Sequence, residues 1–266
     1  MPLRRLAPVA LISLLALGLI ACTALTREEA AQALEEAELS GQASALTSNS
    51  IELTTTFTIG AAVEVAAGEL VTFYEAQLPC AEVALAGATL TITYGVTGMC
   101  EYRGQRFAGS HSVTIMANEM SQVIVSHSWD ALTNGELSVT GTAMVTWNGA
   151  DLTRRVVHET TWTRISDGRQ GVGSGDRTQA GLGGDITQGF TVDGSRSWDG
   201  DAGLWVLGID SVAWRWDDPV PESGRYTLET PFDKNLTLTF SREDDTTILV
   251  VAASGAKEYE IRVNKR

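Results

Sequence analysis

The sequence is poor in the residues from which nucleic-acid, metal and catalytic sites are usually built. Its 19 lysines and arginines stand against 33 aspartates and glutamates, a net charge of −14. Affinity for nucleic acid comes mainly from clustered basic side chains, so no nucleic-acid partner is expected. Only three histidines are present, and three cysteines are too few for a disulfide scaffold. With 44% hydrophobic residues, however, the 266 residues can bury the core of one large domain or two small ones.

An apolar segment lies at the N-terminus. Arg4 and Arg5 precede an apolar run from Leu6 to Ala21, which is short for a membrane span and typical of a secretory signal peptide. The run ends in Leu19-Ile20-Ala21-Cys22, which resembles the lipobox of bacterial lipoproteins. The resemblance implies removal of residues 1–21, lipidation of Cys22 and attachment to a membrane through its acyl chains.

Thr23 follows the expected lipidation site. In relatives of this signal, an aspartate at that position marks retention in the inner membrane. The resemblance therefore implies export to the bacterial outer membrane, on its periplasmic face or at the cell surface.

Residues 22–50 are expected to join the lipid anchor to the body of the protein. Thr26 and Glu29 have the spacing of a capping box. Good helix formers continue to Leu39, and Ser40-Gly41 is a typical helix stop. Because the apolar stripe is thin, we expect a short exposed helix followed by a flexible spacer over residues 42–50.

From residue 51 onward the hydrophobic period is two, which is typical of β-strands. Alternating segments recur around Ile51–Ile59, Leu90–Tyr94, Leu137–Trp147 and Leu236–Phe240, with turn signals such as Asn148-Gly149 between them. The pattern predicts an all-β domain over residues 51–266, an antiparallel meander forming a sandwich or a partly closed barrel, with no helix after residue 50.

The segment Asp167–Gly189 is rich in glycine and shows no strand pattern. It is predicted to be a long loop that joins two halves, residues 51–166 and 186–266. A weak sequence similarity links Val139–Gly149 to Val192–Gly200, and it leaves open whether the halves arose by duplication.

Two cysteines remain once Cys22 carries lipid. An exported protein meets an oxidising compartment, so Cys80 and Cys100 are predicted to form a disulfide. A zinc site would lack its other ligands, and a redox pair would usually be more closely spaced.

Catalytic and metal-binding patterns are sparse. His127 and His158 are expected on one sheet face, two strands apart, but a metal there would need His111 or Glu159 as a third ligand, and Glu159 points to the other face. Ser254 and Lys257 have the Ser-x-x-Lys spacing of penicillin-recognising enzymes without the partner motifs. No catalytic residue, metal or cofactor is assigned.

All seven tryptophans lie between residues 129 and 216. Four of them are candidate ligand-binding aromatics, since an exposed row could stack on sugars or contact lipid: Trp198, Trp205, Trp214 and Trp216. Buried, the same side chains would fill the core of a threonine-rich sheet.

The sequence favours a non-enzymatic envelope lipoprotein that acts as a surface, structural or binding module for a glycan, lipid or envelope protein. The alternative is a periplasmic carrier or assembly factor for lipids or outer-membrane components, which requires a large apolar cavity. A hydrolase is the third hypothesis and requires a histidine beside a carboxylate and a serine.

Overall fold

A computed structural model describes residues 24–95, 99–102 and 104–265. The expected signal peptide and Cys22 lie outside the described residues. Within them the chain forms two helices, α1 (Arg27–Leu53) and α2 (Val63–Gln77), and fourteen strands. The strands are β1 (Ala81–Ala86), β2 (Thr89–Tyr94), β3 (Cys100–Tyr102), β4 (Gln105–Asn118), β5 (Gln122–Thr133), β6 (Leu137–Asn148), β7 (Thr153–Arg164), β8 (Gln170–Leu182), β9 (Asp185–Gly200), β10 (Gly203–Arg215), β11 (Ser223–Glu229), β12 (Asn235–Arg242), β13 (Thr247–Ser254) and β14 (Lys257–Asn264).

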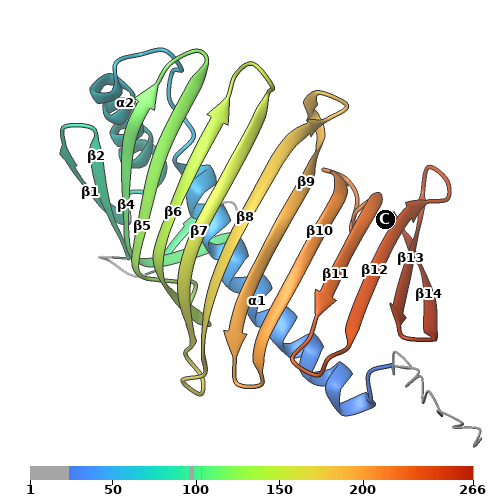
Figure 1. Cartoon of the computed structure of the whole chain (residues 1–266). Helices are drawn as coiled ribbons and strands as arrows, with labels where there is room; N and C mark the ends of the chain where they lie inside the picture. Colours follow the sequence, from blue (N-terminus) through green and yellow to red (C-terminus); the bar gives the residue numbers. More distant parts are fainter. Residues whose placement is uncertain (1–23, 96–98, 103, 266) are drawn as a thin grey trace, which may run out of the picture.

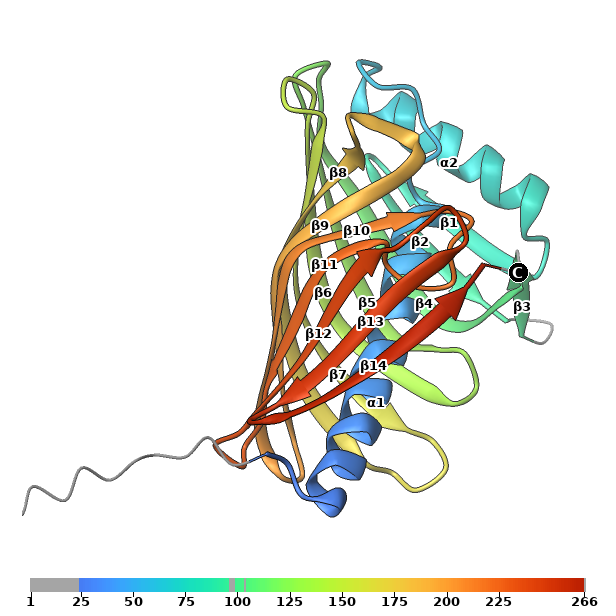
Figure 2. The same cartoon turned by 90° about the vertical axis from the view of Figure 1, so that its right-hand side faces the viewer.

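The strands form one antiparallel sheet in sequence order, and only β3 leaves the path by pairing with β4 (Figure 1). The expected antiparallel meander is therefore confirmed. The sheet curves around α1 but does not close, since its two edge strands, β1 and β14, do not pair with each other (Figure 2). It is closer to a partly closed barrel than to a two-sheet sandwich.

Bulges help to curve the sheet. Register shifts interrupt β5 near Ala131 and β10 near Ser211, and both residues have a φ of 50°. Glycines face them on the neighbouring strands: a Cβ on Gly109 would lie 2.1 Å from the Ala131 carbonyl oxygen, and one on Gly224 would lie 2.3 Å from that of Ser211. Each bulge increases the local bend and twist, so the concave face can wrap a helix.

Helix α1 differs from the short exposed helix that the sequence predicts. The capping box is confirmed, since Thr26 Oγ1 accepts from Glu29 N and the Glu29 carboxylate accepts from Thr26 N. The helix then continues through Gly41 and the expected spacer at residues 42–50, and it takes in the start of the expected strand at Ile51. Burial of one helix face against the sheet outweighs the weak helix propensity of the glycine and serines.

Helix α2 contradicts the expectation of no helix after residue 50. Its buried side chains Ala66, Ala67, Leu70 and Tyr74 are spaced along one helix face. They join the main hydrophobic core, which lies between the sheet and the two helices. The alanines and the glycine of this segment carry little hydrophobic signal, and the pattern is therefore weak in the sequence.

The expected loop over residues 167–189 is also wrong, because most of it forms β8 and the start of β9. Glycines occupy concave-face positions of β8 because larger side chains of β7 lie over them. A Cβ on Gly171 would lie 2.3 Å from Trp162 Cζ2, and one on Gly175 would lie 2.3 Å from His158 Cε1. The sheet is therefore continuous across the expected boundary between two halves.

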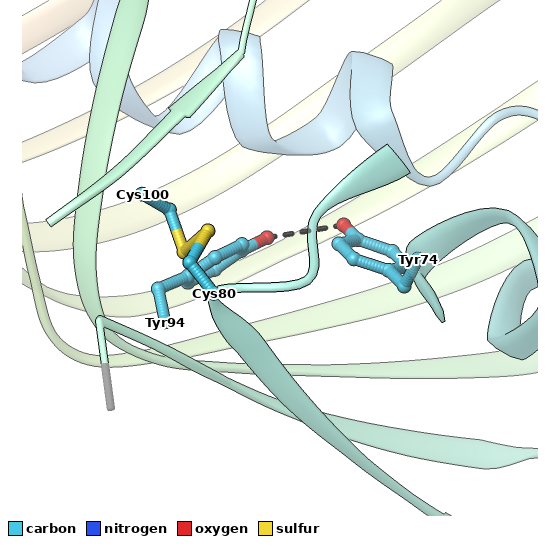
Figure 3. The surroundings of a disulfide bond; sticks show 4 residues. All are labelled: Tyr74, Cys80, Tyr94 and Cys100. Carbon is cyan, nitrogen blue, oxygen red and sulfur yellow. Dashed lines mark hydrogen bonds between the residues drawn. A yellow bond between two sulfur atoms is a disulfide. The ribbon is translucent and has the colours of Figure 1, made fainter. Parts of the chain in front are cut away.

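The predicted disulfide between Cys80 and Cys100 is confirmed, with 5.5 Å between the two Cα atoms (Figure 3). It ties the segment before β1 to β3. Beside it, the buried hydroxyls of Tyr74 and Tyr94 are hydrogen-bonded at 3.0 Å. Together the disulfide and the tyrosine pair join α2, the β1–β2 hairpin and β3 at the β1 edge of the sheet.

Candidate ligand-binding cavity

Over the later strands of the sheet, α1 is the helix that covers the concave face, and α2 contributes nothing to the lining there. A cavity of about 1210 Å³ lies between this part of the concave face and α1. The helix contributes short side chains to the wall: Ala33, Ala37, Gly41, Ser44, Ala45 and Ser48. The sheet contributes larger apolar ones: Phe190, Val192, Leu207, Ile209, Trp214 and Leu238. Because most of the helix side chains on this wall are small, much of the space between helix and sheet stays unfilled.

The opposite face of α1 is firmly packed, so the helix is a fixed wall of this cavity. Leu39 and Leu46 belong to the main core with β2–β7. Near the other end of the helix, the fully buried carboxylate of Glu36 pairs with Arg169, and Glu29 pairs with Lys234 at 2.6 Å.

One rim of the cavity carries exposed apolar side chains. Met120, Leu152, Ile186 and Trp216 all line the cavity and are 59–77% exposed. They lie at or beside the β4–β5, β6–β7, β8–β9 and β10–β11 turns, which an antiparallel meander places at one end of the sheet (Figure 1). The Trp216 indole donates to the Ile186 carbonyl oxygen at 2.8 Å, which fixes it at this rim.

Basic side chains project from the concave face into this apolar space. Arg154 has partners: its guanidinium pairs with Glu52 at 2.5 Å, donates to Gln179 and lies over the Trp147 ring. Arg177 and Arg196 also line the cavity. The Arg196 guanidinium lies over the Trp198 ring, 5.7 Å from its centroid. The Nε atoms of both arginines are nevertheless buried without an acceptor in the described part of the chain.

The weak polar contacts of these two arginines are made to α1. Arg177 Nη1 lies 3.4 Å from Ser44 Oγ, and Arg196 Nη1 donates to the Ser40 carbonyl oxygen at 3.2 Å. Burial lowers the pKa of Arg177, with Arg154 adding to the effect. Burial, followed by the charge of Arg177, lowers the pKa of Arg196 to about 10.

His158 lies in the same basic region. Burial, with smaller contributions from Arg177 and Arg196, lowers its pKa to about 4. The side chain is therefore neutral at pH 7, and the positive charge in the cavity comes from the arginines.

The four candidate tryptophans have different environments. Trp198 and Trp205 are buried, stack at 6.2 Å between ring centroids and contact α1 through Ala33. Trp214 lines the cavity and Trp216 stands at its rim. The four therefore do not form an exposed row: Trp198 and Trp205 fill the core, the other alternative that the sequence left open, and Trp214 and Trp216 contribute to the cavity.

The expected placement of two histidines is confirmed, since Ala143 of β6 is the register partner of both His127 and His158. His127 is hydrogen-bonded to His111, not to a carboxylate. Across residues 24–95, 99–102 and 104–265, no group of three or more potential ligands is placed to hold a metal ion. Ser254 lies in the β13–β14 hairpin, where its hydroxyl accepts from Leu25 N at 3.1 Å.

Sequence reasoning missed Arg177 and Arg196 as site residues. Arg177 falls in the segment that was predicted to be a loop, so no strand face could be assigned to it. The available signal was the alternation of Gly171, Gly173, Gly175, Arg177 and Gln179, which is the concave face of β8.

Among the described residues, neither helix is long and apolar enough to cross a membrane. Comparisons with protein-family models, with curated proteins and with solved structures found no match.

Proposed function

We propose that this protein is a non-enzymatic envelope lipoprotein that carries a lipid-like amphiphile in the cavity between α1 and the sheet. The observation that supports it is the cavity itself, which is lined mainly by apolar side chains and bordered by an apolar rim. Its volume of about 1210 Å³ exceeds the roughly 300–1,000 Å³ of drug-sized ligand sites. A ligand with one or more alkyl chains fits a space of this size and lining.

Transfer of alkyl chains into this space supplies the driving force for binding. Each methylene group removed from water contributes about 0.8 kcal/mol. The exposed rim gives the ligand an apolar route to the interior, since contiguous exposed apolar side chains are typical of membrane, ligand or partner contacts.

The position of the first described residues supports a carrier over a passive anchor. Leu25 is bonded to Ser254 in the β13–β14 turn, at the end of the sheet opposite the rim. Only two residues separate Leu25 from Cys22, a span of about 10 Å at most. A protein lipidated at Cys22 would therefore present the rim away from the membrane that holds it.

A glycan-binding surface has less support. Stacking on sugars needs exposed aromatic faces, and of the four candidates only Trp216 is exposed. Its indole nitrogen is already bonded to the backbone of the β8–β9 turn region.

Gly41 offers a direct test of the cavity. A Cβ at this position meets nothing within 4 Å, and the glycine lies inside a helix, so a larger residue fits without backbone strain. We expect Gly41→Phe to fill part of the cavity and to weaken saturable binding of the neutral fluorophore N-phenyl-1-naphthylamine by about tenfold, the equivalent of two methylene contacts.

Ala31→Phe is the matched control, since Ala31 is exposed on the same helix away from the cavity. Native mass spectrometry of gently extracted wild-type protein should also show a co-purifying amphiphile that G41F lacks. No saturable fluorophore binding by the wild type, or equal binding by G41F, would contradict the proposal.

A further inference from the structure

Arg177 and Arg196 stand out from the other arginines that line the concave face or its edges. Arg154, Arg164 and Arg169 each form an ion pair with a carboxylate of α1. Within the described residues, neither Arg177 nor Arg196 has a carboxylate within ion-pair distance, although the protein has 33 acidic residues. None of the acidic side chains in the described residues pairs with these two arginines, which therefore lie in a mainly apolar cavity without a carboxylate partner.

Such an arrangement is costly without a ligand. A buried charge is normally paired, because loss of hydration is not compensated in an apolar environment. Here two like charges are placed near each other on paired strands: Arg177 is the register partner of Gly194, two residues before Arg196. Each also has a buried Nε–H without an acceptor.

We propose that Arg177 and Arg196 bind the anionic group, a phosphate or a carboxylate, of the amphiphile that occupies the cavity. This inference rests on the proposed function and specifies its ligand class. Guanidinium groups bind both anions through paired N–H donors, which suits the free Nε atoms. The anion would lie beside α1 near Ser40 and Ser44, and its alkyl chain would extend along the apolar wall at Leu207 and Ile209.

Neighbouring groups fit this assignment. Tyr226 lines the cavity near both arginines, and their charges partly offset the effect of burial, which raises its pKa. Its hydroxyl is a further hydrogen-bond donor. His158 lies beside the same two arginines and gains a favourable interaction on protonation once an anion is bound.

The test compares three probes on full-length protein: dodecyl phosphate, 1-dodecanol and inorganic phosphate, each measured by displacement of N-phenyl-1-naphthylamine and by calorimetry. The wild type should bind dodecyl phosphate at least about tenfold more tightly than dodecanol, the equivalent of one charge-assisted hydrogen bond. R177Q/R196Q should lose this preference and keep its affinity for dodecanol. R155Q is the control, because Arg155 lies on the convex face, paired with Asp176.

The outcomes separate the two proposals. Equal affinity of the wild type for dodecyl phosphate and dodecanol, or an unchanged preference in R177Q/R196Q, overturns the anion site and leaves the carrier proposal standing. Binding of inorganic phosphate as tight as that of dodecyl phosphate overturns the assignment to an amphiphile. Failure of all three probes to bind overturns the carrier and the anion site together.

Discussion

His111 Nε2 and His127 Nδ1 lie 3.1 Å apart on the concave face of the sheet, and both rings stack with Trp129. Burial, reinforced by the neighbouring His127, holds the pKa of His111 well below that of free imidazole. Burial, with a smaller contribution from Arg154, lowers the pKa of His127 to about 3. The pair is therefore neutral in the folded protein.

This pair makes stability depend on pH. Below pH 6.5 the unfolded chain binds protons that the folded histidines do not, so acid favours unfolding. We expect the free energy of unfolding to fall between pH 6.5 and 5 by up to about 1.4 kcal/mol per pH unit for each buried histidine. Urea unfolding at pH 7, 6 and 5 measures this slope. His127→Gln should reduce it, and an identical slope in the variant would contradict the assignment.

Removing the two cavity arginines that have no carboxylate partner should stabilise the ligand-free protein. Arg177→Met together with Arg196→Met replaces two desolvated charges by apolar side chains, which is often stabilising by about 1–4 kcal/mol. Urea unfolding of protein from which any bound amphiphile has been removed measures the change in the free energy of unfolding. Arg155→Met, on the convex face, should change stability by less than about 1 kcal/mol. A loss of stability in the cavity variant would show that the arginines are satisfied without a ligand.

The ion pair between Glu36 and Arg169 should hold the first half of α1. Glu36 is fully buried, so Arg169→Met leaves an uncompensated carboxylate. A cost of about 3 kcal/mol is expected in chemical unfolding. The comparison is again Arg155→Met, whose Asp176 partner is exposed. Similar small costs for both variants would exclude a clamping role for the buried pair.

The disulfide should contribute measurably to stability. It closes a sequence separation of 20 residues, which corresponds to about 3 kcal/mol in the chain-entropy model. Cys80→Ala together with Cys100→Ala should lower the free energy of unfolding by about this amount. Wild-type protein with a reductant present serves as the comparison and should lose a similar amount. Unchanged unfolding in both would contradict this prediction.

The apolar rim should control exchange of the ligand with lipid surfaces. Met120 is 77% exposed at the mouth of the cavity. Met120→Asp should slow transfer of a fluorescent alkyl probe from the protein to phospholipid vesicles by about fivefold, since roughly 1 kcal/mol of apolar contact is lost. Met116→Asp is the control, because Met116 is 58% exposed on β4 and does not line the cavity. Equal rates in both variants would argue against transfer through this rim.

The sequence was informative where the signal is local. The capping box of Thr26 and Glu29 depends on residues three apart. The disulfide was predictable because the sequence has only three cysteines, one of them in the expected signal segment. Strand alternation identified most of the sheet, because side chains on one face must be apolar wherever α1 and α2 cover it. The row of His127, Ala143 and His158 followed from that alternation and from the short turns between strands.

The errors share a physical cause. Gly41 and the serines that follow it resemble a spacer, and the glycines of β8 resemble a loop, because local propensity does not register what lies opposite a small side chain. In the folded protein Gly171 and Gly175 make room for Trp162 and His158 of β7, whereas Gly41 leaves the cavity open.

By itself, then, the sequence determined an antiparallel sheet, its disulfide and the start of the helix. The sheet follows from alternation along the strands, the helix start from neighbours in the chain, and the disulfide from the small number of cysteines. Tertiary structure alone decided that a 27-residue helix spans the curved sheet, and that its small side chains leave an apolar cavity in which Arg177 and Arg196 reach the helix. The reason is geometric: the curvature of the sheet sets the distance from helix to strand. That distance decides whether a small residue closes a contact or leaves space for a ligand.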